Sequence, residues 1–154
     1  MSQKAGIYAN TMINMTTAQN APAETDRASF SIIIVNFNGG AYIQQALDSL
    51  ARQTRRDFEV ILIDNASTDG SATGLKTEAL PHFILMAETE NHGYARATNL
   101  AADKAQGEWL VCLNPDAQAE PNWLEEIAKG QQRHPDTKMF ASAQSDAVNP
   151  DRLD

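Results

Sequence analysis

Short apolar runs alternate with segments of helical period from residue 30 onward. Four runs are rich in β-branched and other apolar residues, at 31–37, 58–64, 82–87 and 108–113. Continuous apolar runs of this length are typical of strands that are covered on both faces of a parallel sheet. Between them, residues 41–53 and 93–106 carry apolar or small residues at helical spacing. The pattern predicts a doubly wound α/β sandwich with a mostly parallel sheet.

Turn residues and prolines divide the remaining segments. The polar cluster at 65–71 is expected to lead into a short helix that Pro81 ends. Pro121 is expected near the start of a further helix, which Pro135 closes. Residues 137–141 are expected to form one more short strand.

These elements predict a single domain over residues 29–141. Residues 1–28 have neither strand nor helix periodicity and are interpreted as a disordered leader. Residues 142–154 are interpreted as a polar tail. At 154 residues, the chain is long enough for one domain with a core and too short for two to be expected.

Composition limits which binding partners and which cellular location are expected. Twelve basic against twenty acidic residues give a net charge of -8, which argues against a nucleic-acid partner but not against one small nucleotide bound through a metal ion. Cys112, the only cysteine, lies in an apolar run and is interpreted as a buried thiol. No apolar run approaches the roughly 18 residues of a membrane span. A cytoplasmic protein is therefore predicted, with attachment at the inner face of a membrane as an open alternative.

Polar side chains follow the apolar runs where each strand is expected to end. Because the carboxyl ends of parallel strands meet at one edge of the sheet, these side chains are expected to border a ligand crevice. They are Asn36, Asn38, Asp64, Asn65 and Asp116.

The two acids at this edge each have a structural and a functional interpretation. Asp64 is placed to accept a hydrogen bond from a base or a ribose, or else to cap a turn or helix together with Ser67 and Thr68. Asp116 is placed to bind a hard divalent ion, since Mg²⁺ is often held by one or two carboxylates and substrate phosphates. Alternatively, the sequence Asn-Pro-Asp at 114–116 forms only a turn.

Residues 91–99 place a glycine before an expected helix. Arg96 and Asn99 fall on one face of that helix, where Arg96 is suited to a pyrophosphate or is simply solvated. His92 is equally compatible with a turn or a ligand contact, and the three histidines show no zinc spacing. The sequence has neither a dinucleotide-binding GxGxxG after its first strand nor a Walker A motif.

Four segments together resemble the family 2 glycosyltransferases, whose donor-binding part has the GT-A fold. The segments are 31–40, 58–71, 91–99 and 107–116. The resemblance extends over about residues 30–140, and the order and spacing of the four motifs make it specific. It implies a Rossmann-like α/β/α sandwich, truncated at the C-terminus.

The resemblance also implies roles for individual residues. Val35 and Asn36 would border the nucleotide base, and Asp64 would hydrogen-bond a uracil or thymine. Asp116 matches the last acid of the family's D-x-D motif and would hold Mg²⁺ or Mn²⁺ against the donor diphosphate, in a Lewis-acid role. The other residues expected to contact the nucleotide-sugar are Asn38, Asn65, Arg96, Asn99 and Asn114.

The sequence departs from the family pattern in two ways. Asn114 stands where the first acid of the motif is usual, and the Asn-Pro-Asp form resembles the rhamnosyltransferase-like branch, which hints at a deoxysugar donor such as dTDP-rhamnose. The acceptor-binding half and its general base are expected to be absent. Glu120, Glu125 and Glu126 are interpreted as partners of a helix dipole and not as that base.

The leading hypothesis is therefore a domain that binds a UDP- or dTDP-linked sugar with a divalent metal. Transfer would be to a saccharide, a lipid-linked acceptor or another hydroxyl, in the synthesis of cell-surface polysaccharide. The alternative is a catalytically inactive remnant or interaction module of the same fold. A nucleotidyltransferase would explain fewer of the motifs.

Overall fold

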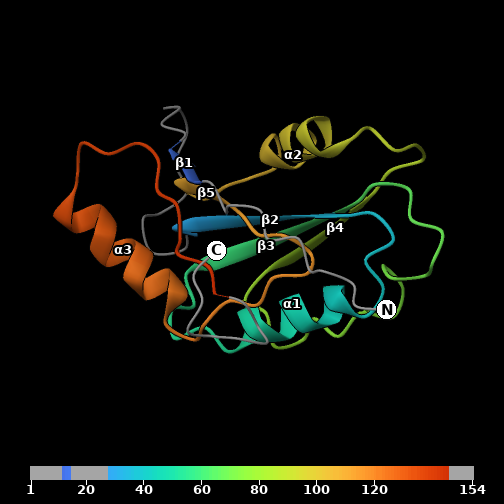
Figure 1. The fold of residues 1–154 in the computed structure, drawn as a ribbon, viewed down its shortest axis with the longest axis horizontal. Helices are drawn as coiled ribbons and strands as arrows, with labels where there is room; N and C mark the ends of the chain where they lie inside the picture. Colours follow the sequence, from blue (N-terminus) through green and yellow to red (C-terminus); the bar gives the residue numbers. More distant parts are fainter. Residues whose placement is uncertain (1–11, 15–27, 146–154) are drawn as a thin grey trace.

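A five-stranded sheet forms the centre of the protein. The computed structural model describes residues 12–14 and 28–145. The strands are β1 (Met12–Asn14), β2 (Phe30–Asn36), β3 (Phe58–Asp64), β4 (Phe83–Ala87) and β5 (Trp109–Cys112). Their order in the sheet is β1-β5-β2-β3-β4 (Figure 1). Strands β5, β2, β3 and β4 pair in parallel and β1 is antiparallel to β5, so the expectation of a mostly parallel sheet is confirmed.

Helices cover both faces of this sheet. They are α1 (Tyr42–Ala51), α2 (Tyr94–Ala102) and α3 (Trp123–Arg133). Helices α1 and α3 lie on one face and α2 lies on the other (Figure 1). None of the described helices is long and apolar enough to cross a membrane. The α/β/α sandwich expected from the sequence is confirmed.

The two faces of β2 enter two separate cores, because successive side chains of a strand point to opposite sides. Ile32 and Ile34 pack in the larger core under α1 and α3. Ile33 and Val35 pack in the smaller core under α2. All seven residues of β2 are buried, which explains why its sequence is almost continuously apolar.

Strand β1 was not predicted. It lies within the segment interpreted as a disordered leader, and its backbone pairs with β5, with Met12 opposite Val111. Three residues are too few to show strand periodicity, so the pairing depends on the open edge of β5 and not on a local signal. Residues 1–11 and 15–27 of the expected leader, and residues 146–154 of the expected tail, lie outside the described residues.

The short helix expected before Pro81 is wrong. Residues 65–82 form turns and bends. Gly70 and Gly74 adopt positive φ angles of 77° and 66°, which interrupt a right-handed helix. The backbone N–H of Lys76 then donates to the side chain of Gln44 in α1 and not to a helical carbonyl.

The strand expected at 137–141 is also wrong. The segment is irregular, with isolated bridge pairing only at Ala141 and Ser145. Side-chain contacts hold it in place of a strand ladder. The ring of Phe140 lies 5.7 Å from that of Trp109, and Trp123 Nε1 donates to the Ser142 hydroxyl at 2.9 Å.

A buried carboxylate organises the amino edge of the sheet. Glu59 is 2% exposed. It accepts hydrogen bonds from the Ser31 hydroxyl at 2.6 Å, from Gln106 N at 2.6 Å and from Gly107 N at 3.3 Å. These bonds fix the connection between α2 and β5 against the start of β2. They therefore set where β5 begins and where it delivers the residues that follow it.

The chain direction reverses the order of the strands, and this matters at the opposite, carboxyl edge of the sheet. Helix α1 connects β2 to β3 on one face, and α2 connects β4 to β5 on the other. Strand β5 returns to the far side of β2, so the strand order reverses between β2 and β5. Ligands of open α/β sheets bind outside the carboxyl ends of the strands at such a reversal point.

Candidate functional site

Asn36, at the end of β2, is the centre of a polar network on the α1 face of the carboxyl edge. Its side chain is fully buried. Asn36 Nδ2 lies 2.9 Å from Asp64 Oδ1 and 2.9 Å from Ser71 Oγ. It also lies 3.1 Å from Ser67 Oγ. One amide therefore links the ends of β2 and β3 to the turn that follows β3.

The loops after β2 and β3 are tied together by further bonds. Asn38 has a positive φ of 55°, and its side-chain oxygen accepts from the N–H groups of Thr68 and Asp69. Asp69 in turn accepts from Gly40 N and from the Ser71 hydroxyl. The Ser71 hydroxyl is the main cause that lowers the pKa of Asp69. Asn38 thus joins the loop after β2 to the turn after β3.

Asp64 occupies the position expected from the sequence, but the interpretation as a helix cap is wrong. Its side chain accepts from Asn36, and no helix begins in the turns at 65–80. Asp64 Oδ2 has no hydrogen-bond partner within the described part of the chain. The half-buried carboxylate therefore has one anchored oxygen and one oxygen available to a ligand.

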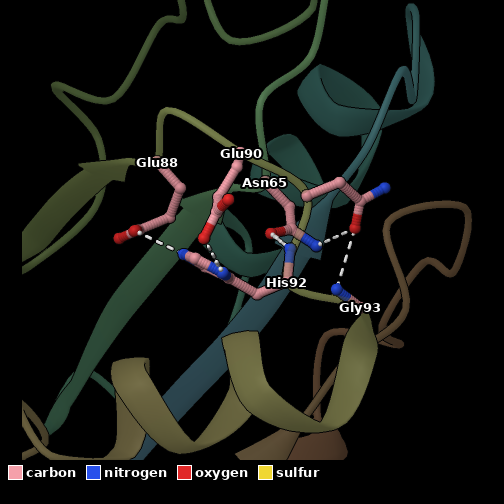
Figure 2. Close-up of polar contacts among 6 residues, drawn as sticks. Asn65, Glu88, Glu90, His92 and Gly93 are labelled. Carbon is pink, nitrogen blue, oxygen red and sulfur yellow. Dashed lines mark hydrogen bonds and ion pairs between the residues drawn. The ribbon is translucent and has the colours of Figure 1, made fainter.

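A second polar network lies on the α2 face of the same edge. Asn65 is 2% exposed, and its Nδ2 donates to Asn91 Oδ1 at 2.8 Å. Asn91 Oδ1 also accepts from Gly93 N, while Asn65 Oδ1 accepts from His92 N at 2.9 Å (Figure 2). The loop that begins α2 is therefore held to the end of β3 by a pair of asparagines.

His92 lies between two carboxylates in this loop. Its Nε2 is 3.1 Å from Glu88 Oε2, and its Nδ1 is 3.3 Å from Glu90 Oε1 (Figure 2). The His92 side chain is only 9% exposed. Of the two sequence interpretations, the geometry shows His92 holding the turn together.

Replacing His92 by Ala is expected to loosen the loop at 88–93. The change removes a nearly buried side chain together with its contacts to Glu88 and Glu90. A loss of about 1 kcal/mol in the free energy of unfolding is expected. Chemical denaturation measures the loss, and amide hydrogen exchange locates it. His134→Ala, at an exposed position, is the control, and equal protection of 88–93 in both variants would contradict the role.

Arg96 and Asn99 are exposed on α2. Their side chains form no hydrogen bond or ion pair within the described residues, so the structure does not join them to Asp64. Nearer to the crevice, Tyr94 begins α2, and its hydroxyl is in contact with Cys112 at the end of β5. Burial raises the pKa of the Cys112 thiol, which disfavours the reactive thiolate.

Asn114 and Asp116 follow β5 on the other side of β2. Asn114 is 9% exposed, and its carbonyl accepts from Ala117 N at 3.1 Å, so the turn interpretation of this segment is correct for the backbone. The turn leaves Asp116 exposed. Its carboxylate has no hydrogen-bond or ion-pair partner in the described part of the chain.

This arrangement suits a metal ion that is shared with a ligand. Among the described residues, no three His, Cys, Asp or Glu side chains gather to form a metal site. Mg²⁺ keeps several waters and is commonly held by one or two carboxylates plus substrate phosphates. The exposed carboxylate of Asp116 fits that kind of coordination and not an all-protein cage.

The structure thus divides the sequence-predicted residues into three groups. Asn36, Asn38 and Asp64 are joined on the α1 face of the crevice edge. Asn65 lies on the α2 face, and Asn114 and Asp116 follow β5. Sequence reasoning missed Ser71, Asp69 and Asn91, which bind these side chains, and Glu88 and Glu90, which contact His92. The density of Asn, Ser and Asp directly after β3 was the available signal for the first two.

Fold and site together define an α/β protein with polar and acidic side chains at the carboxyl edge of a mostly parallel sheet, where the strand order reverses. Comparison with known proteins identifies the family within this class. The profile of glycosyl transferase family 2 matches residues 31–151. The chain belongs to this family.

Proteins of similar sequence include glycosyltransferases. The chain is 37% identical over 89 residues to a PGL/p-HBAD biosynthesis glycosyltransferase of Mycobacterium tuberculosis, covering 56% of this chain and 35% of that protein. It is 29% identical over 120 residues to an uncharacterized glycosyltransferase of Haemophilus influenzae, covering 77% of this chain and 40% of the relative.

Two solved structures share the fold with a TM-score of 0.64. The first is S. aureus TarS 1–349 in complex with UDP-GlcNAc, with 27% identity over 70% of this chain and 32% of that one. The second is the mannosyltransferase PcManGT from Pyrobaculum calidifontis in complex with GDP-Man and Mn²⁺, with 31% identity over 72% of this chain and 34% of that one. The matched part of the chain spans 35% and 40% of the length of the two relatives from M. tuberculosis and H. influenzae.

Proposed function

We propose that the chain binds a nucleotide-diphosphate sugar together with a divalent metal ion, as the donor-binding part of a glycosyltransferase. The observation that supports this most directly is the pair of carboxylates on opposite sides of β2. Asp64 is held by a buried amide and keeps one oxygen available. Asp116 is exposed beyond β5 without a protein partner among the described residues. Family membership adds the expectation of a sugar donor.

In this proposal, different residues bind different parts of the donor. Asp64 accepts a hydrogen bond from the imide N–H of uracil or thymine, in the crevice that Val35 and Asn65 border from the α2 face. Asp116 holds Mg²⁺ or Mn²⁺, with Asn114 beside it toward the sugar. When bound, the ion would neutralise charge on the departing nucleoside diphosphate as a Lewis acid.

The donor and acceptor classes follow from the same resemblance. The Asn-Pro-Asp sequence at 114–116 favours a dTDP-linked deoxysugar such as dTDP-rhamnose over a UDP-linked hexose. Arg96 and Asn99 would meet the donor from α2. The acceptor would be a saccharide or a lipid-linked hydroxyl in cell-surface polysaccharide synthesis, in the cytoplasm or at the inner face of the membrane.

Isothermal titration calorimetry tests donor binding. UDP, dTDP and their sugars are expected to bind in the presence of Mn²⁺ or Mg²⁺, and removal of the metal with EDTA is expected to lower affinity by about tenfold or more, because the diphosphate then lacks its counter-charge. CDP and CDP-linked sugars serve as matched ligands with a different base. Absence of binding to every uridine and thymidine nucleotide, with metal present, would overturn the proposal.

Binding and transfer are separate outcomes. A chain that binds the donor in calorimetry but releases no nucleoside diphosphate with any acceptor would be the inactive module of the same fold. Measured sugar transfer by the same purified chain would exclude that module.

A further inference from the structure

We infer that Asn36 is a positioning residue that orients the carboxylate of Asp64 for base recognition and does not itself contact the nucleotide. The inference rests on the proposed function, because it assigns a second residue to the same base-binding site. It replaces the role that the sequence implied for Asn36, which was to border the base directly.

Burial excludes a direct contact. The Asn36 side chain is 0% exposed and both of its polar atoms already have partners. Its Oδ1 accepts from Gly39 N at 3.1 Å. Its Nδ2 carries two hydrogens but has three acceptors within 3.1 Å, on Asp64, Ser67 and Ser71. A ligand would have to displace one of these partners to reach the amide.

The same contacts fix which way the amide faces. A flipped side chain would direct its oxygen at the carboxylate of Asp64 and its NH₂ group at the N–H of Gly39, and both contacts would then be repulsive. Among the three acceptors, Asp64 carries the formal charge, and charge-assisted hydrogen bonds are about twice as strong as neutral ones. The amide therefore has one favourable orientation, and in it the amide nitrogen points at Asp64.

Sheet register makes the pairing rigid. Asn36 and Asp64 are direct partners across the parallel pair β2 and β3, so their side chains leave neighbouring strands at the same level. The backbone adds a second link, because Asn65 N donates to Asn36 O at 2.8 Å. A Cβ at Gly39 would lie 2.6 Å from Asn36 Oδ1, so the loop after β2 approaches the amide as closely as only glycine allows.

Anchoring one oxygen gives Asp64 directional specificity. With Oδ1 held by Asn36, Oδ2 is the oxygen left for a ligand donor. The imide N–H of uracil or thymine supplies such a donor, whereas cytosine has an unprotonated nitrogen at the same position. A carboxylate free to rotate would accept from many donors, so loss of the anchor is expected to reduce both affinity and the preference for uracil over cytosine.

A double-mutant cycle tests the inference, with calorimetry of UDP and CDP in the presence of Mn²⁺. Asn36→Ala is expected to weaken UDP binding about tenfold, the effect of losing one charge-assisted hydrogen bond. It is also expected to lower the ratio of UDP to CDP affinity. In the Asp64→Ala background, the same change is expected to have no further effect, because Asn36 acts through Asp64. Asn36→Ser, which keeps a hydroxyl donor, is expected to recover part of the affinity and replaces Asn36→Ala in the cycle if that variant does not fold.

Ser31→Ala is the matched control. Ser31 is buried in the same strand, and its hydroxyl also donates to a carboxylate, that of Glu59 at the opposite edge. This variant is expected to lose stability but to keep the affinity and base preference of the unmodified chain. Unchanged UDP affinity in Asn36→Ala, or losses that multiply with those of Asp64→Ala, would overturn the inference alone. Failure of the unmodified chain to bind UDP or dTDP would overturn the proposed function and this inference with it.

Discussion

Asp116→Asn is expected to remove the metal-dependent part of nucleotide-sugar binding and leave the fold unchanged. The substitution keeps the shape of the side chain but removes the only formal charge of the Asn-Pro-Asp turn at 114–116. Divalent ions such as Mg²⁺ and Mn²⁺ depend on carboxylate oxygens, and this site offers no other group of acids among the described residues. The affinity for Mn²⁺ in the presence of UDP should fall by about a hundredfold, since loss of a direct ligand costs at least as much as loss of an outer-shell partner.

Stability separates this effect from damage to the fold. Asp116 is exposed and has no side-chain partner in the described part of the chain, so its replacement should change the free energy of unfolding by about 0.5 kcal/mol or less. Asp136→Asn makes the same change of charge at another exposed turn and should leave metal dependence intact. Paramagnetic resonance of Mn²⁺ and calorimetry with UDP measure both variants. Retained metal-dependent binding in Asp116→Asn would place the ion elsewhere.

The sheet could be predicted from the sequence because its signal is local. The residues of β2 and β3 are apolar on both faces, and only a strand covered by helices on both sides needs that pattern. The end of each run also marks the carboxyl edge, so Asp64 and Asp116 could be assigned to the crevice before any contact was known. Periodicity and strand order were sufficient for that step.

The partners within the site could not be predicted, because they depend on cross-strand register and loop conformation. The bond from Asn36 to Asp64 requires the two residues to be paired across β2 and β3. The absence of a helix after Asp64 depends on positive φ at Gly70 and Gly74, which a polar, glycine-containing sequence permits but does not require. The contacts of His92 with Glu88 and Glu90 similarly depend on the bend of the chain at residues 89–90, directly after β4.

Gly107→Ala is expected to be severely destabilising, because the backbone of β2 lies where the new methyl group would be. A Cβ at this position would lie 2.5 Å from Ser31 N, 2.6 Å from Phe30 C and 2.7 Å from Ser31 Oγ. The first two atoms are backbone atoms of the central strand, which is paired with β3 on one side and β5 on the other. They cannot move without breaking those ladders. A loss of about 3 kcal/mol in the free energy of unfolding is expected.

Part of that loss in stability comes from hydrogen bonds of the Gly107 backbone that the new methyl group would break. Gly107 N donates to the Ser31 hydroxyl at 2.8 Å and lies 3.3 Å from the buried carboxylate of Glu59. Displacing the backbone would leave Glu59 with fewer donors in an environment that water does not reach, and buried unsatisfied groups are costly. Packing and hydrogen bonding therefore act in the same direction.

Gly74→Ala separates the close contact from a general cost of replacing glycine. Gly74 has a φ of +66°, but a Cβ there would have nothing within 4 Å, so only backbone strain of about 1 kcal/mol is expected. Urea denaturation of both variants measures the difference. Equal losses would show that the approach of Gly107 to β2 is relieved by a small shift. A larger loss for Gly107→Ala would show that the close approach of Gly107 to β2, with its bonds to Ser31 and Glu59, is a rigid part of the amino edge from which β5 begins.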